Sequence, residues 1–440
     1  MSPEKPSNTF PKTASPTSSS LSRRSLLLAS GIGGLAMAGL ELPAQAAAAR
    51  KSSLTRYQAG GFTGQHNGTA AVAGGLGFSR SVLLQPYTDT VWKRCFSFEL
   101  AQWTGPVQSL GFGAKELIAS WHASTPAGTA VRIKLRARTS SGTWTRYFDM
   151  ALWAATPAGT NRPTRTSYKQ SDALARLSTD TLIAASGVTF TAFQARVDLL
   201  RCKGLTVRPE LRQLNVAAAT TPASSTPVTP AGVGRGTNLA VPAYSQMLHL
   251  GHYPEWNGGG QAWCSATSLA MVLDFWKKGP SAAELSWVKP AGHANRQVEH
   301  AVRGVWDAGY RGTGNWAFNT AHATTRGPNA FVTRLRGLDE AELFIRAGIP
   351  LVVSTSFSSS QLSGAGFGTN GHLMVLKGFD AAGNVRVNDP ASGMKPSNAL
   401  VSKTYNRAQF ENAWGRSGGL AYVVHPATKP LPARPAGAAW

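Results

Sequence analysis

The sequence feature that most constrains the fold is a change of composition between residues 217 and 240. This segment, AAATTPASSTPVTPAGVGRGTNLA, is rich in Pro, Thr, Ser, Ala and Gly. Such a composition is typical of a solvated linker between globular parts. The chain is therefore predicted to form two domains, residues 50–216 and 241–430, and its length is sufficient for each domain to bury its own core.

Residues 50–216 have the pattern of an all-β domain. Short runs rich in apolar residues are separated by Gly, Pro, Ser and Thr, and they include SVLLQPY, RCFSFELAQW, ELIASWHA, AVRIKLRART, TWTRYFDMALW and FTAFQARVDLL. Runs of this length and spacing predict an antiparallel β-sandwich or a jelly roll.

The clearest predicted strand covers residues 130–139, where apolar and basic residues alternate. Because successive side chains of a strand point to opposite faces, one face carries four cations at intervals of about 7 Å. These cations are Arg132, Lys134, Arg136 and Arg138. A solvent-exposed sheet face is the commoner explanation of such a pattern. Repulsion between stacked like charges favours the alternative, a docking strip for an anionic cell-wall polymer.

Residues 241–430 combine helical and strand patterns. From Ala266 onward, apolar residues recur at the i, i+3, i+4 and i+7 positions of one helix face, until Gly279-Pro280 ends the pattern. Helices are predicted at residues 264–278, 294–309 and 339–347, and strands at residues 350–357, 371–380 and 385–389. Helices that precede strands in the chain predict an α+β class.

The first 46 residues are predicted to be a twin-arginine signal peptide. A Ser-Arg-Arg sequence at residues 22–24 leads into an apolar stretch that is too short and too rich in Gly and Ala for a membrane anchor. Ala44-Gln45-Ala46 then supplies a small-x-small cleavage site. We therefore expect export by the twin-arginine route and a secreted mature protein without a membrane-spanning segment.

The chain is strongly basic, with a formal net charge of +23. Removal of residues 1–46 takes away four positive and two negative charges, which leaves +21. A surface of this charge favours anionic partners such as wall polymers, acidic proteins or lipid head groups. Nucleic acid is not expected, because the protein is predicted to be exported and no recognition motif with interleaved aromatic residues is present. No pattern indicates an oligomer, so a monomer is expected.

Three cysteines are an odd number for an exported protein. Cys95 and Cys202 both lie in strand-like segments of the first domain, and an oxidising compartment would allow them to pair. Sequence does not fix their geometry, so the two residues can equally be unbridged. If they pair, Cys264 is the free thiol.

Cys264 lies at the start of its predicted helix. The partial positive charge of a helix N-terminus lowers the pKa of a thiol, and the thiolate is the nucleophilic form of sulfur. Such a nucleophile needs an imidazole as base and a third group that orients the imidazole. The predicted strand GHLMVLKGFD supplies His372, and the next predicted strand, VRVNDP, supplies Asp389.

The predicted pairing of these two strands brings His372 and Asp389 together. If residues 380–383 form the turn, Asp389 lies opposite Met374, and Met374 shares a face with His372. Asp389 is then one diagonal step from His372, within reach of its side chain. A register slip of one residue would place Asp389 on the other face of the sheet.

These motifs resemble the C39-like family of papain-like cysteine peptidases. The resemblance rests on VPAYSQ, WCSATSLAMVL, GHLMVLKGFD and VNDPAS in this order, and it covers residues 241–425. It implies a papain-like α+β fold and a hydrolase that cleaves peptide bonds. By this resemblance, Cys264 is the nucleophile, His372 the general base and acid, and Asp389 the residue that orients His372.

The resemblance also implies an oxyanion hole formed with a Gln side chain. Gln246 matches by its flanking residues, whereas Gln261 lies much nearer to Cys264 in the sequence, so both are candidates. Ser265 departs from the family pattern, in which Gly or Glu more often follows the cysteine. The Ser- and Gly-rich residues 356–371 lead into His372 and are expected to form a mobile lip of the cleft.

The chain is accordingly expected to be a secreted cysteine peptidase that its N-terminal domain holds near an anionic surface. Two other functions fit the same sequence: a non-catalytic protein that binds wall polymers, and an amidase or transpeptidase that acts on wall peptides with the same triad. His249 and His252, in HLGH, have a metal-like interval. No Cys or carboxylate cluster accompanies them in the sequence, so neither a metal nor another cofactor is expected.

Overall fold

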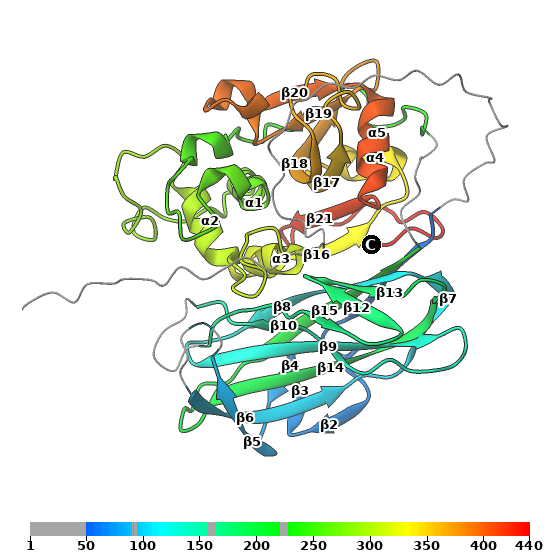
Figure 1. Ribbon diagram of the computed structural model, residues 1–440, viewed down its shortest axis with the longest axis vertical. Coiled ribbons are helices and arrows are strands. Elements are labelled where there is room, and N and C mark those ends of the chain that lie inside the picture. Colours follow the sequence, from blue (N-terminus) through cyan, green and yellow to red (C-terminus); the bar gives the residue numbers. More distant parts are fainter. Residues whose placement is uncertain (1–49, 90, 92–94, 157–162, 221–227) are drawn as a thin grey trace, which may run out of the picture.

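The computed structural model describes residues 50–89, 91, 95–156, 163–220 and 228–440 (Figure 1). It has an N-terminal β region, residues 50–220, and a C-terminal α+β region, residues 228–440, which are stacked along the long axis of the molecule. The predicted signal peptide lies outside the described residues and stays a prediction. Within the described part of the chain, no helix has the length and apolar character needed to cross a membrane.

The β region consists of two antiparallel sheets. The eight-stranded sheet has the order β11-β12-β13-β8-β15-β4-β3, with β1 paired to β15. Its strands are β1 (Ser52–Tyr57), β3 (Thr69–Val72), β4 (Gly75–Phe78), β8 (Glu116–Ser124), β11 (Gln170–Ser171), β12 (Ala175–Ser178), β13 (Thr181–Ala184) and β15 (Glu210–Ala219). The seven-stranded sheet has the order β10-β9-β14-β6-β2, with β5 paired to β6 and β7 paired to β14. Its strands are β2 (Gln65–Asn67), β5 (Leu83–Thr88), β6 (Cys95–Thr104), β7 (Gln108–Ala114), β9 (Thr129–Thr139), β10 (Phe148–Trp153) and β14 (Phe190–Cys202).

Apolar side chains from both sheets form one shared core. Trp121 and Leu214 come from the first sheet and Ile133 and Val197 from the second, and all four are fully buried. Strands that present an apolar face on one side only bury it by packing sheet against sheet. The prediction of a mainly β N-terminal part is therefore confirmed, whereas the more specific jelly roll stays a prediction.

The basic face predicted for residues 130–139 lies on β9, and much of its charge is neutralised within the protein. Lys134 Nζ lies 3.1 Å from Asp198 Oδ2, and Arg132 Nη1 lies 3.8 Å from the same oxygen. The guanidinium of Arg136 lies over two aromatic rings, at 4.5 and 4.8 Å from their centroids. Arg138 is the exposed member of the strip. Binding of an anionic polymer by this strip stays a prediction.

The two cysteines of the β region lie on different strands. Cys95 begins β6, and Cys202 ends β14, where it is buried. The side chain of Cys95 lies outside the described part of the structure, so a bridge between these residues stays a prediction.

The α+β region is built on one six-stranded antiparallel sheet with the order β16-β21-β17-β18-β19-β20. Its strands are β16 (Asn329–Arg334), β17 (Leu351–Phe357), β18 (Thr369–Phe379), β19 (Val385–Asn388), β20 (Ser402–Tyr405) and β21 (Leu420–His425). The α-helices are α1 (Cys264–Phe275), α2 (Gln297–Val305), α3 (Trp316–Thr325), α4 (Leu338–Arg346) and α5 (Arg407–Arg416). Short 3₁₀ helices are η1 (Gln246–His249), η2 (Gly260–Ala262), η3 (Ser392–Met394) and η4 (Asn398–Leu400).

Helices cover both faces of this sheet (Figure 1). α4 and α5 share a core with one set of strand residues, including Met374 and Leu376. α1 and α2 lie on the other face and share a second core with the strand residues that alternate with the first set, including Leu373 and Val375. Alternate strand residues thus point to opposite layers, as the period of two requires. This arrangement confirms the predicted α+β class.

The predicted helices and strands of this region are present with different ends. α1 ends at Phe275 rather than at residue 278, because Lys277 has a φ of 55°, the left-handed conformation in which a helix terminates. α2 begins at Gln297, three residues after its predicted start. α3, α5 and the strands β16, β20 and β21 were not predicted from the sequence.

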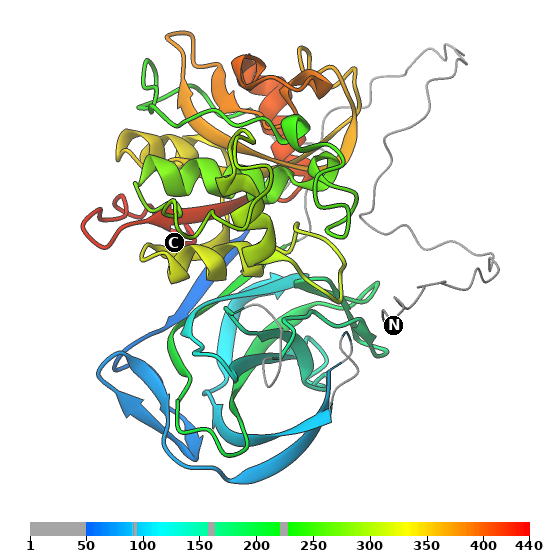
Figure 2. The ribbon, with the colours of Figure 1, turned by 90° about the vertical axis from the view of Figure 1, so that its left-hand side faces the viewer.

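α3 was not predicted because nearly all of its residues are buried between the two regions (Figures 1 and 2). Its sequence therefore lacks the division into an apolar and a polar face that identifies a surface helix. The ring of Phe318 lies 6.1 Å from that of Trp121 and 5.2 Å from that of Trp153, both in the β region. The backbone N–H of Trp316, in the first turn, donates to Asp180 Oδ2 at 2.7 Å. A carboxylate at this end of a helix is stabilised by the helix dipole.

Polar contacts also connect the two regions. The backbone N–H of Ser167 donates to Asp307 Oδ1 at 2.9 Å, and Arg165 Nη2 donates to the carbonyl of Arg303 at 2.8 Å. Buried polar groups of this kind stabilise one orientation of the β region relative to the α+β region, because any other orientation would leave these groups without hydrogen-bond partners. The β region is therefore a fixed part of the molecule.

The segment predicted as a solvated linker, residues 217–240, is partly different in the structure. β15 continues three residues past the predicted domain boundary at 216. Residues 228–240 lie against the α+β region, where Glu342 accepts hydrogen bonds from the backbone N–H groups of Gly232 and Gly234 at 2.8 and 2.9 Å. This part of the predicted linker is solvent-accessible at most positions, as expected, but it is anchored to the α+β region because its small residues let the backbone approach buried acidic side chains. The predicted domain boundaries stay a prediction.

Candidate active site

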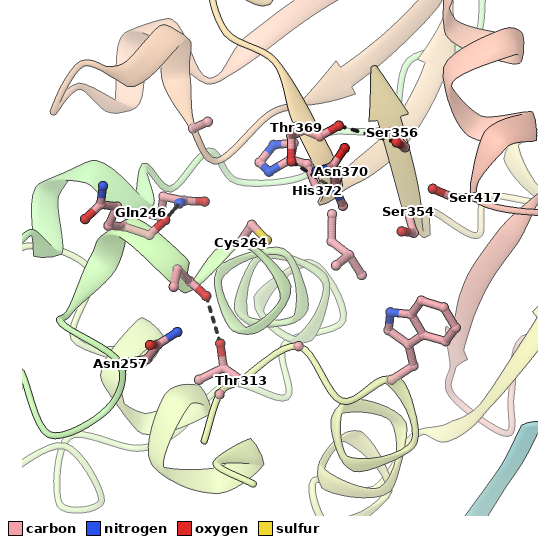
Figure 3. Close-up of a pocket in the computed structure, with 18 of the residues that line it drawn as sticks. Gln246, Asn257, Cys264, Thr313, Ser354, Ser356, Thr369, Asn370, His372 and Ser417 are labelled. Carbon is pink, nitrogen blue, oxygen red and sulfur yellow. Dashed lines mark hydrogen bonds between the residues drawn. The ribbon is translucent and has the colours of Figure 1, made fainter. Parts of the chain in front are cut away.

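Cys264 is the first residue of α1 and lines a cavity of about 440 Å³ (Figure 3). Its side chain is partly buried. Because it stands in the first turn, its backbone N–H has no acceptor within the helix and is available to a ligand. The predicted helix start is confirmed, and it places the sulfur at the positive end of the helix dipole.

Close packing of η1 against η2 fixes the chain that leads into Cys264. A Cβ at Gly260 would lie 2.0 Å from the carbonyl oxygen of Gln246 and 2.9 Å from the Cβ of His249. Only glycine allows this approach. The side-chain Nε2 of Gln246 then donates to the carbonyl of Gln261 at 2.9 Å. Gln246 is thereby held beside the N-terminus of α1.

His372 and Asp389 lie together on adjacent strands. His372 belongs to β18, and Asp389 directly follows β19. His372 Nε2 donates to Asp389 Oδ1 at 2.7 Å, and both residues are buried. Asp389 Oδ1 also accepts from the backbone N–H of Ala391 at 3.0 Å, and its Oδ2 accepts from the hydroxyl of Tyr405 at 2.8 Å. The carboxylate therefore has a donor on each oxygen and a fixed orientation.

The sulfur and the ring interact electrostatically. Burial raises the pKa of the Cys264 thiol, but a hydrogen bond to His372, the charge of that ring and the backbone N–H groups of Leu373 and Ser265 together bring this pKa below 9.0. Burial disfavours the charged form of His372, but Asp389 and the thiolate outweigh it and raise the pKa of His372 to about 10. Each group thus favours the charged form of the other, the thiolate of Cys264 and the imidazolium of His372.

The interaction with His372 also keeps Asp389 charged. Burial acts to raise its pKa, but the charge and hydrogen bond of His372, together with the hydroxyl of Tyr405, leave the pKa of this carboxyl below its ordinary value. Because Nε2 of His372 is bonded to Asp389, Nδ1 of the same ring is the atom available to the sulfur. Cys264, His372 and Asp389 thus lie in the spatial order that a nucleophile, a base and an orienting group require.

Of the two glutamines considered from the sequence, Gln246 is held more firmly. Both residues line the cavity. Gln246 is buried and carries the hydrogen bond described above, whereas the side chain of Gln261 is exposed. A preorganised amide stabilises developing negative charge better than one that must first be ordered. The geometry thus favours Gln246 as the donor near Cys264.

The walls of the cavity come from both regions of the chain. Arg311, Arg334 and Arg416 supply positive charge, and Glu116 reaches the cavity from β8 of the β region. Glu116 forms an ion pair with Arg334. A substrate in this cavity would therefore contact the β region as well as the sulfur.

The Ser- and Gly-rich segment before His372 lies at the edge of the cavity. Residues 367–371 line it, with Thr369 and Asn370 next to His372 (Figure 3). The ring of Phe367 packs edge-on against the ring of His372 at 5.2 Å. The position expected for this lip agrees with the structure, and its mobility stays a prediction.

Two residues of this site, Tyr405 and Glu116, were not predicted from the sequence. Tyr405 ends β20, which pairs with β19, and its hydroxyl reaches Asp389 across that pair. Glu116 is more than a hundred residues away from Arg334 in the sequence, and it reaches the cavity because the two regions pack against each other. A tyrosine that ends a short strand and a glutamate that begins one carry no local sequence signal for such roles.

Comparison with known families agrees with the sequence resemblance. Residues 50–219 match the family described as the Peptidase C39 N-terminal domain, and residues 238–422 match the Peptidase C39-like family. No curated protein matches the chain significantly. Among solved structures, the chain is similar to a crystal structure described as that of a C39-like peptidase from Bacillus anthracis, with 19% sequence identity and a TM-score of 0.27. That match covers 43% of this chain and 96% of the other. Each region of this chain thus matches its own family model, the α+β region that of the Peptidase C39-like family and the β region that of the Peptidase C39 N-terminal domain.

Proposed function

We propose that this chain is a secreted cysteine peptidase that hydrolyses peptide bonds with Cys264, His372 and Asp389. The observation that carries the proposal is the 2.7 Å hydrogen bond from His372 Nε2 to Asp389, which leaves Nδ1 of the ring for the sulfur. The match to the Peptidase C39-like family supports a peptidase-type function. The lowered pKa of Cys264 supports it further, because the thiolate is the attacking species.

The first half of the proposed reaction forms an acyl-enzyme. The Cys264 thiolate attacks the carbonyl carbon of the peptide bond, and a carbon–sulfur bond forms. The oxyanion accepts hydrogen bonds from the Gln246 amide and from the backbone N–H of Cys264. The carbon–nitrogen bond then breaks as the imidazolium of His372 gives its proton to the leaving amine.

The second half releases the acyl group. His372 is now neutral and removes a proton from a water molecule, whose oxygen attacks the thioester carbon. The carbon–sulfur bond breaks, a carboxylic acid leaves, and the thiolate and imidazolium are restored. Throughout the cycle, the Asp389 carboxylate keeps the ring oriented and stabilises its charged form.

The charges in and around the cavity suggest the substrate class. Three arginines and Glu116 line the walls. Together with the net charge of +21 expected after signal removal, they favour peptides that carry acidic groups, such as acidic proteins or the peptide stems of a cell wall. In this proposal, the β region holds the enzyme near such an anionic surface and completes the cavity.

The replacement Gln246→Ala is expected to lower kcat by about 10²- to 10³-fold, because it removes one donor to the oxyanion. The replacement Gln261→Ala is the matched control and should change kcat by less than about threefold, since its side chain lines the cavity but is exposed and would first have to be ordered. Steady-state kinetics on one peptide substrate measures both. A large loss in Gln261→Ala with little loss in Gln246→Ala would reverse the assignment.

Alkylation of Cys264 by iodoacetamide should fall less steeply with decreasing pH between 8 and 6 in the folded chain than in the unfolded chain. An ordinary thiol loses about tenfold in thiolate for each pH unit below its pKa, whereas the pairing with His372 lowers the pKa of Cys264 and reduces this loss. Peptide mass spectrometry after timed labelling gives the rate at this residue. The same residue in the urea-unfolded chain is the control, and an equally steep pH dependence in the folded chain would contradict the lowered pKa.

The proposed function is tested with a panel of acidic peptides and wall-stem peptides in water enriched in ¹⁸O. Hydrolysis places one ¹⁸O in the new carboxylate, whereas transpeptidation joins two peptides and places none. Alkylation of Cys264 before the assay should stop the reaction. If the folded chain cleaves nothing while it still binds wall polymer, it is a binding protein and the peptidase proposal fails.

A further inference from the structure

A second cluster of reactive side chains lies outside the cavity of Cys264. It consists of His249 at the end of η1, His252 just after it, His293 in the loop before α2, and Glu299 in the first turn of α2. One donor atom from each of the four side chains lies within 4.8 Å of all the others. His249 and Glu299 are fully buried.

Three histidine ring nitrogens gather around one carboxylate oxygen of Glu299. Oε1 of Glu299 lies 2.6 Å from Nδ1 of His249, 2.7 Å from Nδ1 of His252 and 3.2 Å from Nε2 of His293. His293 Nε2 also lies 3.0 Å from His249 Nδ1. Two ring nitrogens at this distance cannot both donate to the carboxylate and bond to each other, because a nitrogen that carries a proton has no lone pair to accept with. Hydrogen bonds alone therefore do not satisfy this arrangement.

The other nitrogen of His252 indicates which atom faces the cluster. His252 Nε2 lies 2.5 Å from the carbonyl oxygen of Lys289, and a carbonyl only accepts, so Nε2 carries a proton. In the neutral ring, Nδ1 then directs a lone pair at the Glu299 carboxylate. Histidines that bind metals commonly donate their second N–H to a backbone carbonyl in this way. A cation between the ring and the carboxylate would remove the repulsion.

We infer that His249, His252, His293 and Glu299 bind a zinc ion. Three imidazole nitrogens and one carboxylate oxygen form a donor set typical of zinc, whereas calcium and magnesium prefer sets made of oxygen alone. Four protein ligands leave no open position, which is characteristic of a structural rather than a catalytic zinc site. Tetrahedral coordination places donors about 3.3 Å apart. Binding would therefore move apart the pairs that lie 2.6 to 3.2 Å from each other and bring the wider pairs, which are up to 4.8 Å apart, closer together.

The zinc ion would stabilise the segment that carries the oxyanion donor. His249 lies on the same 3₁₀ helix as Gln246, and the backbone of Gly260, just before Cys264, packs against it. The ligands come from segments up to 50 residues apart in the sequence, so the ion would join the chain before α1 to the start of α2. Zinc binding would thus position the active-site segment without taking part in the reaction.

No metal was expected here from the sequence, and a zinc site at this cluster is contrary to that expectation. HLGH alone supplied two ligands, and the sequence showed no further ligand near them. His293 and Glu299 lie more than 40 residues away and reach the cluster only in the folded chain.

The test measures zinc bound to the full-length purified chain. The chain is stripped with a chelator, incubated with zinc, passed through a desalting column and analysed by plasma mass spectrometry. We expect one zinc ion for each chain. Replacement of zinc by Co²⁺ should give the visible absorption bands of a tetrahedral site, which need no variant for their interpretation.

The variant His293→Ala should bind zinc at least about 100-fold more weakly, because it loses one of four ligands. The matched control is His300→Ala, on the same helix as Glu299, whose ring contacts His322 rather than the cluster. It should bind zinc as the wild type does. If the wild type retains no zinc and shows no Co²⁺ bands, or if His293→Ala binds as well as the control, the cluster is only a hydrogen-bonded group and the inference fails. Neither readout depends on peptidase activity.

Discussion

Replacement of Cys264 by alanine is expected to reduce kcat for peptide hydrolysis by at least about 10⁴-fold, because it removes the proposed nucleophile of the acyl-enzyme. The methyl group is smaller than the thiol, and the side chain is only partly buried, so the fold should tolerate the change. Steady-state kinetics with product detection by mass spectrometry measures the loss. A substantial residual rate would show that the reaction does not depend on sulfur.

Cys264→Ser is a closer control for shape, and it is also expected to be inactive. A serine hydroxyl has a much higher pKa than a thiol, so it stays protonated at neutral pH and does not form the ion pair with His372 that activates Cys264. The site is suited to a thiolate that is already ionised. An active serine variant would therefore contradict the proposed ion pair, even if the alanine variant were inactive.

The register of β18 and β19 illustrates how much of this site the sequence could predict. A turn over residues 380–383 was expected to place Asp389 opposite Met374. In the structure, Phe379 pairs with Val385, so the turn is one residue longer than predicted. A bulge between Leu376 and Gly378 restores the register, and Val375 pairs with Asn388. The predicted contact between His372 and Asp389 is present because two deviations cancel, which strand periodicity could not reveal.

Contacts between distant segments account for most of what sequence could not show. Tyr405 reaches Asp389 through a short strand at the edge of the sheet, and Glu116 reaches the cavity from the other region. α3 has buried residues on nearly every side because it packs between the regions, and this removes the periodic pattern that identifies a surface helix. Motifs within one segment, such as the helix that begins at Cys264, were predictable because one local pattern determines them.

The contact of the two regions at the cavity places a residue of the β region where a bound substrate would lie. Glu116 neutralises Arg334 at the cavity wall, so that wall would carry uncompensated positive charge if the β region were absent. α3 connects the same interface to the helices behind Cys264, since it contacts β8 on one side and the core that includes α1 on the other. The substrate preference of the peptidase is therefore expected to depend on both regions.

Replacement of Asp389 by asparagine is expected to lower kcat/KM by about 10³- to 10⁴-fold. The carboxylate is the main group that raises the pKa of His372, so its loss lowers that pKa and weakens the imidazolium that stabilises the thiolate. In the wild type, activity rises with pH as Cys264 ionises and falls as His372 loses its proton near pH 10. In Asp389→Asn, the alkaline fall should move to lower pH and the acid rise to higher pH. The pH dependence of kcat/KM measures both the acid rise and the alkaline fall of the activity.

Tyr405→Phe is the matched control for this prediction, because it removes the 2.8 Å hydrogen bond to Asp389 and keeps the carboxylate. Loss of one hydrogen bond to a charged group should cost about 10- to 100-fold in kcat/KM. Its pH limits should move much less than those of Asp389→Asn, since the negative charge next to His372 remains. If both variants lost activity equally and shifted neither limb, Asp389 would support the local structure without stabilising the charged ring. A graded loss, with a narrowed pH range only in Asp389→Asn, is the outcome expected if Asp389 stabilises the charge of His372.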